Sequence, residues 1–230
     1  MQKDEFARND HLFPRASDSL VLSDGCTLCQ EAGLAFVGRD IIWGNGARNA
    51  KVMVVGKDSA GAEPDQPLWR GSRCTGMPLT NKKSGAKLRI MLDKACLPPS
   101  SVFITNTVKC NEGHDERGVS YEDLATVCLK YLRQELAIIR PKALIALGVP
   151  AAERVWGLWT NRKLLAPMGL HPAVTLDGFP PFTGTLNEGT REEEGHSAIE
   201  VFALMHPSIV EGSREVPYVA NLRAIAARLG

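Results

Sequence analysis

Four short runs of apolar residues stand out along the chain. They span residues 51–55 (KVMVV), 102–106 (VFITN), 143–147 (ALIAL) and 199–205 (IEVFALM). Each run has the length of a strand and is nearly continuous instead of alternating, which is typical of strands buried on both faces of a parallel sheet. The four runs therefore predict four such strands.

Helical patterns lie between and after these runs. Residues 88–95 place Leu, Met, Leu and Ala at the i, i+3, i+4, i+7 spacing of one helix face. Ser120 and Asp123 form a capping box, and Pro150 stands in the first turn of a further helix. Residues 217–229 predict a terminal amphipathic helix. The alternation of strands and helices predicts an α/β protein with a doubly wound open sheet and helices on both faces.

Ligands of such sheets bind beyond the carboxyl ends of the strands. In this chain those ends are residues 56–59 (GKDS), Asn106, Gly148 and residues 206–208 (HPS). The sequence therefore predicts a binding site built from these four segments.

The chain has 230 residues, enough for one sizeable α/β domain and too few for two. We expect an N-terminal arm over residues 1–25 and a single domain over residues 26–230. Residues 179–197 are rich in Pro, Gly and Glu, and we expect them to form a mobile surface excursion.

No apolar run approaches eighteen residues, so we expect no membrane-spanning helix and no membrane partner. The charged N-terminus MQKDEFARND does not resemble a secretory signal, so we expect an intracellular protein. The net charge is +1, whereas non-specific nucleic-acid binders usually carry more positive charge. This nearly neutral net charge argues against a protein that coats DNA by electrostatic attraction alone. It permits a local groove with basic side chains.

Four of the six cysteines have a spacing that predicts a cluster site. Cys26 and Cys29 form a CxxC pair, Cys110 follows the second predicted strand, and Cys128 lies on the next predicted helix. Clustered thiols in a reducing compartment are more often metal ligands than disulfides. Four thiolates from three places in the chain predict an all-cysteine iron–sulfur site.

Two alternatives remain open for these thiols. Zinc is the less favoured one, because a zinc ribbon usually has a second tight CxxC pair and the second pair here is widely split. Cys110 and Cys128 could also be buried core thiols, although the polar surroundings of Cys110 argue against this. For Cys74 and Cys96 we favour the interpretation as buried core thiols.

Seven segments in this order resemble the iron–sulfur uracil-DNA glycosylases, and among them family 4 of that superfamily. The resemblance covers the chain from about Cys26 to the C-terminus. Any one segment is weakly specific, whereas their order and spacing together are highly specific. The segments are residues 42–46 (IWGNG), 50–56 (AKVMVVG), 76–79 (GMPL), 104–110 (ITNTVKC), 128–132 (CLKYL), 140–148 (RPKALIALG) and 206–208 (HPS).

The resemblance implies a three-layer α/β/α fold with a four-stranded parallel sheet and a pocket for a base flipped out of DNA. It also implies that Asn106 binds the uracil edge and that His206 donates a hydrogen bond to a uracil oxygen. Pro207 and Ser208 would shape the loop that pinches the DNA backbone. His171 also precedes a proline, but we assign it a structural role because no predicted strand precedes it. The implied ligands of a [4Fe–4S] cluster are Cys26, Cys29, Cys110 and Cys128.

The chain departs from the family pattern in three places. Residues 56–61 read GKDSAG where the family has GEAPG, so Lys57 replaces the carboxylate that helps to place the hydrolytic water. Leu79 stands where the family usually has phenylalanine, and loss of base–aromatic stacking would cost about 1–3 kcal/mol. Residues 209–215 carry two acidic residues where phosphates would approach. The candidate catalytic residues are then His206, Asn106 and Asp58.

The leading hypothesis is a DNA glycosylase of base excision repair that removes uracil or a related deaminated base. We expect it to act as a monomer on DNA in the cytoplasm, associated with a prokaryotic-type nucleoid. The alternative is a non-catalytic iron–sulfur protein that binds nucleic acid on the same fold, which the departures at residues 57 and 79 favour. The candidate substrate-binding residues are Gly56, Lys57, Ser59, Leu79, Pro207 and Ser208.

Overall fold

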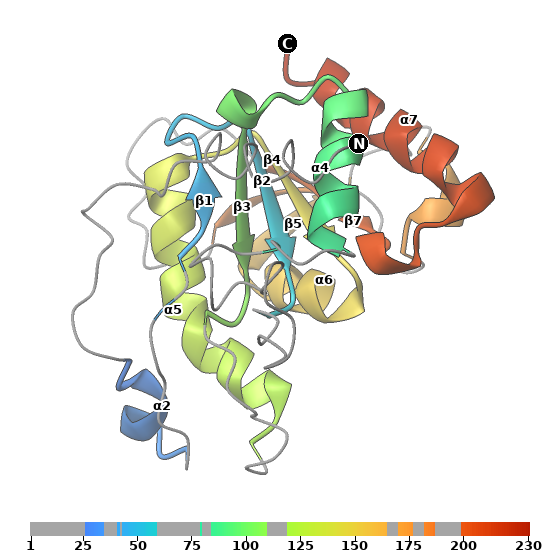
Figure 1. Ribbon diagram of the computed structural model, residues 1–230. Coiled ribbons are helices and arrows are strands. Elements are labelled where there is room, and N and C mark those ends of the chain that lie inside the picture. Colours follow the sequence, from blue (N-terminus) through green and yellow to red (C-terminus); the bar gives the residue numbers. More distant parts are fainter. Residues whose placement is uncertain are drawn as a thin grey trace.

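The computed structural model describes residues 26–34, 41, 43–58, 79, 84–109, 119–164, 170–176, 182–186 and 199–230. Within these residues a seven-stranded mixed sheet has helices on both faces (Figure 1). The strand order is β1-β3-β2-β4-β7-β6-β5. The strands are β1 (Asn45–Gly46), β2 (Val52–Gly56), β3 (Val102–Asn106), β4 (Ala143–Leu147), β5 (Trp159–Leu164), β6 (Phe182–Leu186) and β7 (Ile199–Leu204).

The four central strands confirm the predicted parallel sheet. β3, β2, β4 and β7 lie side by side and parallel, and all but one of their residues are buried. β2 lies between β3 and β4, so the chain moves outward to β3 and then crosses back over β2 to form β4. This reversal is the topological switch point where α/β sheets bind ligands.

The sheet is larger than four strands because antiparallel strands extend both edges. β1 pairs with β3, while β6 pairs with β7 and with β5. The expectation that residues 179–197 form an excursion was wrong for residues 182–186, which are β6. The edge of β7 that faces away from β4 forms backbone hydrogen bonds with this segment. Such backbone pairing is difficult to predict from a short polar sequence.

Helices cover both faces of the sheet (Figure 1). Along β2, Val52 and Val54 join one buried cluster, and Met53 and Val55 join the other. The first cluster contains residues of α4 (Ser84–Lys94) and α7 (Glu215–Ala227), and the second contains residues of α5 (Tyr121–Ile139) and α6 (Val149–Trp156). The continuous apolar runs are thus explained by burial on both sides. The remaining helical segments are α2 (Leu28–Glu31), η3 (Pro99–Ser101), η5 (Pro172–Val174), η6 (Pro207–Ile209) and η7 (Gly212–Arg214).

The helix signals in the sequence are confirmed. Ser120 is the N-cap of α5, and its hydroxyl accepts a hydrogen bond from the backbone N–H of Asp123 at 3.1 Å. Gly148 precedes α6, whose second residue is Pro150. Cys96 contradicts the expected burial, because it is exposed and left-handed (φ 58°) in the Schellman turn that ends α4. None of the helices in the described parts of the chain is long and apolar enough to span a membrane.

Candidate functional site

The carboxyl ends of β2 and β3 lie next to each other and hold three of the predicted site residues together. Gly56 and Asn106 are paired in the β2–β3 register. A Cβ atom added to Gly56 would lie 2.5 Å from the Asn106 side-chain oxygen and 3.3 Å from a Leu79 methyl group. The absence of a side chain at Gly56 therefore gives the Asn106 amide and the Leu79 side chain the space they occupy.

Asn106 and Leu79 are both buried, with 0% and 6% of their surface exposed. Leu79 also has a left-handed backbone (φ 50°), a conformation that is uncommon for leucine and concentrates at functional sites. Both side chains are therefore held in the interior at the carboxyl end of the sheet.

Gly56→Ala tests whether this space matters. We expect the added methyl group to displace the Asn106 amide and to cost about 1–3 kcal/mol of stability by overpacking. Gly157→Ala is the control, because the same methyl group would make ordinary contacts of 3.5 Å there. Thermal unfolding of the two variants is the measurement. Equal stability of the two variants would contradict the assignment.

Lys57 and Asp58 follow β2 and form an adjacent ion pair with 3.6 Å between Lys57 Nζ and Asp58 Oδ2. The backbone carbonyl of Lys57 accepts hydrogen bonds from the Val108 N–H and the Thr107 hydroxyl. The Lys57 ammonium also lies 4.8 Å from the centre of the Tyr121 ring, within cation–π range. These contacts hold the lysine that replaces the family carboxylate at the edge of the site.

Tyr121 begins α5 and is a member of the site that the sequence did not reveal. Its hydroxyl is 2.7 Å from the Thr107 hydroxyl and donates to the Pro150 carbonyl at 3.3 Å. Burial raises the pKa of Tyr121 to about 12, and the nearby Asp58 carboxylate also raises it. Tyr121 is therefore a neutral phenol at physiological pH and can support Lys57 without adding negative charge.

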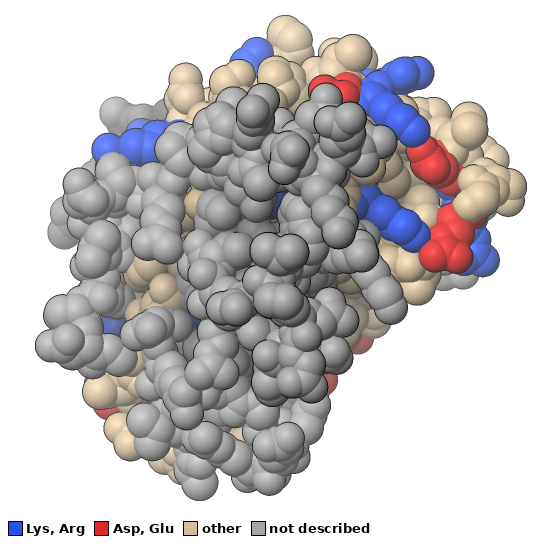
Figure 2. Space-filling model, viewed as in Figure 1, with Lys and Arg blue, Asp and Glu red and all other residues tan. Residues whose placement is uncertain are grey.

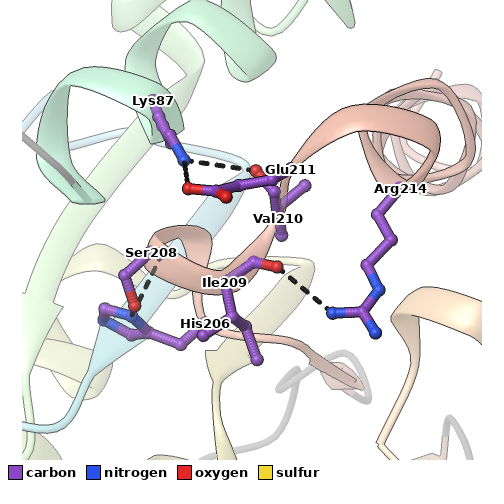
Figure 3. A network of polar contacts seen from close by, with 7 residues as sticks. All are labelled: Lys87, His206, Ser208, Ile209, Val210, Glu211 and Arg214. Atoms are coloured by element: carbon purple, nitrogen blue, oxygen red, sulfur yellow. Dashed lines mark hydrogen bonds and ion pairs between the residues drawn. The ribbon is translucent and has the colours of Figure 1, made fainter.

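His206 begins the short turn that follows β7 (Figure 3). Its Nδ1 atom accepts a hydrogen bond from the backbone N–H of Ser208 at 3.3 Å and lies 2.8 Å from the Ser208 hydroxyl. A backbone N–H can only donate, so Nδ1 is the acceptor and the neutral ring carries its proton on Nε2. The ring thus has one N–H group to offer to a ligand.

Burial lowers the pKa of His206, while the Asp58 carboxylate acts in the opposite direction. Asp58 and His206 both follow strands of the parallel sheet, β2 and β7. Gly148, which follows β4, lies near His206, because a Cβ atom added there would lie 3.4 Å from the Cβ atom of His206. The predicted residues thus lie along the carboxyl edge of the four central strands, and Ser59 is the only predicted catalytic or substrate-binding residue outside the described residues.

We expect His206 to titrate below pH 6.5, the usual histidine value, so that the ring is neutral at pH 7. The unfolded chain binds this proton more readily, so the free energy of unfolding falls as the pH drops below 6.5. Titration of the ring protons by NMR checks this prediction, with the resonance assigned by its loss in His206→Gln. A midpoint above 6.5 would contradict it.

The loop after His206 is fastened to α4 (Figure 3). Lys87 Nζ donates to the Glu211 carboxylate at 3.0 Å and to the Val210 carbonyl at 3.4 Å. Glu215, the second acid in this stretch, pairs with Lys94. The two acidic residues that the sequence placed where phosphates would approach are therefore each paired with a lysine. Figure 2 shows the resulting mixture of basic and acidic side chains on the α4–α7 side.

The other predicted histidine-proline turn has a different setting. The His171 ring is exposed, and the backbone N–H of His171 donates to the Asn221 side chain at 2.7 Å. Asn221 is buried in α7. These backbone contacts are consistent with the structural role that we assigned to His171.

Three of the four predicted cluster ligands share one buried group. Cys26, Cys29 and Cys128 are 7%, 1% and 2% exposed and belong to the same buried cluster between α2 and α5. Burial raises the pKa of Cys29 to about 11, and the neighbouring Cys128 and Cys26 raise it further. The three thiols are therefore close enough to influence one another's ionisation. Cys110 lies outside the described residues.

This donor set fits an iron–sulfur cluster. Protonated thiols are costly to ionise in such a buried site, and a cationic cluster would favour the thiolate forms that bind it. Within the described residues, no group of three or more His, Cys, Asp or Glu side chains is arranged to hold one metal ion. A [4Fe–4S] cluster does not need that arrangement, because each cysteine binds a different iron.

The comparisons with known proteins agree with this geometry. A family model described as the uracil DNA glycosylase superfamily matches residues 43–224. A protein of Pyrobaculum aerophilum named type-4 uracil-DNA glycosylase is 30% identical over 134 residues, which are 58% of this chain and 62% of that protein. A protein of Saccharolobus solfataricus with the same name is 25% identical over 192 residues, which are 75% of this chain and 83% of that protein. The chain thus spans less than two thirds of the first relative and more of the second.

Proposed function

Because this chain belongs to the uracil-DNA glycosylase superfamily, we propose that it is a DNA glycosylase that hydrolyses the N-glycosidic bond of uracil, or of a related deaminated base, in DNA. Both relatives carry the name of type-4 uracil-DNA glycosylase. The observation that supports the proposal is that Asn106, Asp58 and His206 all lie at the carboxyl edge of the parallel strands β3, β2 and β7. The products would be free uracil and an abasic site.

Two residues would bind the flipped base. The Asn106 amide offers both a donor and an acceptor, which match the neighbouring N–H and C=O groups of uracil. The His206 Nε2–H would donate to a uracil oxygen. Negative charge builds on that oxygen as the glycosidic bond breaks, so a donor held there stabilises the transition state more than the substrate.

Asp58 would place the water and stabilise positive charge on the sugar. It is the carboxylate of the segment after β2, and its charge raises the pKa of His206, which supports a role for both residues in one site. Lys57 pairs with Asp58 and lies against Tyr121, so its ammonium would orient the carboxylate and attract a DNA phosphate. Leu79 would supply an apolar wall for the base.

We also propose that Cys26, Cys29, Cys110 and Cys128 hold a [4Fe–4S] cluster. When bound, the cluster would serve as a structural cross-link between α2, the segment after β3 and α5. The burial and mutual influence of the three described thiols support this assignment. The protein itself would act as a monomer on chromosomal DNA in the cytoplasm.

An assay on defined oligonucleotides tests the function. Anaerobically purified protein would be incubated with single-stranded and duplex DNA carrying one uracil, hypoxanthine or xanthine, and the products treated with alkali. Cleavage at uracil is expected. Binding of uracil-containing DNA without cleavage of any lesion would instead support the non-catalytic alternative, in which Lys57 and Leu79 abolish hydrolysis.

A further inference from the structure

A fully buried ion pair joins the segment after β3 to the helix α5. Lys109 and Glu135 have side chains that are 1% and 0% exposed, and 2.5 Å separates Lys109 Nζ from Glu135 Oε2. Removing both charges from water is costly, and the attraction repays this cost only with good geometry and additional hydrogen bonds. The burial of this costly pair therefore has to be explained by its surroundings and its role.

The pair has these additional hydrogen bonds. Glu135 Oε1 accepts from the backbone N–H of Gly44 at 2.8 Å, and Oε2 accepts from the Thr105 hydroxyl at 2.8 Å. Lys109 Nζ also donates to the Thr105 oxygen. The carboxylate thus joins the segment before β1, the strand β3, the helix α5 and the segment after β3.

The position of the pair links it to both sites. Lys109 follows Asn106 by three residues and directly precedes Cys110. Glu135 follows Cys128 by seven residues on α5, which places the two side chains on the same helix face.

We propose that Lys109 and Glu135 are positioning residues that set the charge beside the cluster and hold the cluster-bearing segment against the strand that carries Asn106. This inference rests on the [4Fe–4S] cluster proposed above. Some residues do not bind the metal but form hydrogen bonds to its ligands. Replacement of such a residue commonly changes metal affinity by about 10–100-fold. The pair is well suited to that role because its bonds leave Lys109 little freedom to move.

The proposal predicts opposite effects of the two charges on the cluster. A reduced cluster carries one more negative charge than an oxidised one, so a nearby positive charge favours reduction. Lys109→Met removes this charge and is expected to lower the reduction potential. Glu135→Gln leaves the ammonium unbalanced and is expected to raise it. A merely structural role would damage both variants in the same way.

The experiment uses anaerobically purified full-length protein. Iron and sulfide content, the reduction potential and the rate of visible bleaching by a chelator are measured for Lys109→Met and Glu135→Gln. We expect bleaching about tenfold faster in both variants. The controls are Lys94→Met and Glu215→Gln, which remove the partners of an exposed pair on the α4–α7 side and should leave every reading unchanged.

The double variant Lys109→Met/Glu135→Leu keeps the test decisive if a single variant fails to fold, because it leaves no unpaired charge. It is expected to bleach about tenfold faster, whereas its reduction potential should change little because the opposite effects of the two lost charges cancel. Wild-type bleaching of the double variant, or potential shifts of the same sign in both single variants, would overturn the inference alone. Wild-type protein without iron would overturn the cluster proposal as well, and uracil excision remains a separate measurement.

Discussion

His206→Ala is expected to lower single-turnover excision of uracil by about 100- to 1,000-fold, the loss typical of one donor to a developing oxyanion. The structure supplies the reason. The Ser208 N–H occupies Nδ1, so Nε2 carries the proton of the neutral ring, and burial keeps the ring neutral. Alanine removes this donor while leaving the backbone of the turn intact. Binding of uracil-containing DNA should fall much less than excision, because the donor acts mainly in the transition state.

His171→Ala is the matched control for this prediction. The His171 ring also accepts a hydrogen bond from the backbone N–H two residues later, so the two substitutions remove the same local contact. Only His206 is expected to affect excision. If His206→Ala cleaves uracil at the wild-type rate with its visible absorbance intact, the candidate site is misplaced.

Asp58→Asn is expected to lower excision by about 100-fold or more, within the range for loss of a positioned acid–base group. The amide is nearly the same size as the carboxylate, so packing is preserved while the charge is lost. The remaining activity would come from binding of the base by Asn106 and His206. Single-turnover kinetics on a uracil-containing duplex measure the loss.

Lys57→Gln is the comparison that assigns the effect to the carboxylate. The lysine lies beside Asp58 and above Tyr121, and we give it an orienting role. We therefore expect a smaller loss of excision than for Asp58→Asn, together with a weaker dependence of DNA binding on salt. A larger loss in Lys57→Gln would assign the essential charge to the ammonium instead.

The central fold was predictable because burial on two faces leaves a clear pattern in the sequence. The runs at residues 102–106 and 143–147 are β3 and β4 to the residue, since every position in them has to be apolar or internally bonded. The edge strands were missed. β5 and β6 are short and pair antiparallel at the edge of the sheet, and the sequences WTNRKL and FTGTL have no continuous apolar run.

In the candidate site, too, some residues could be predicted from the sequence and others could not. Asn106 and His206 were predictable because they end strands and belong to short recognisable segments. Tyr121 was not, because a tyrosine at the start of a helix has no distinctive sequence signal. The Lys109–Glu135 pair was also hidden, since its partners are 26 residues apart and neither lies in a local charge pattern.

The sequence by itself determined the order of the four central strands and of the helices between them, the spacing of Cys26, Cys29 and Cys128, and the residues at the carboxyl ends of the central strands. These features are local, because periodicity, capping and spacing are properties of neighbouring residues. Only the tertiary structure decided which charges are paired: Glu211 with Lys87, Lys57 with Asp58, and Lys109 with Glu135. Burial and distance set the strength of an ion pair, and folding sets both.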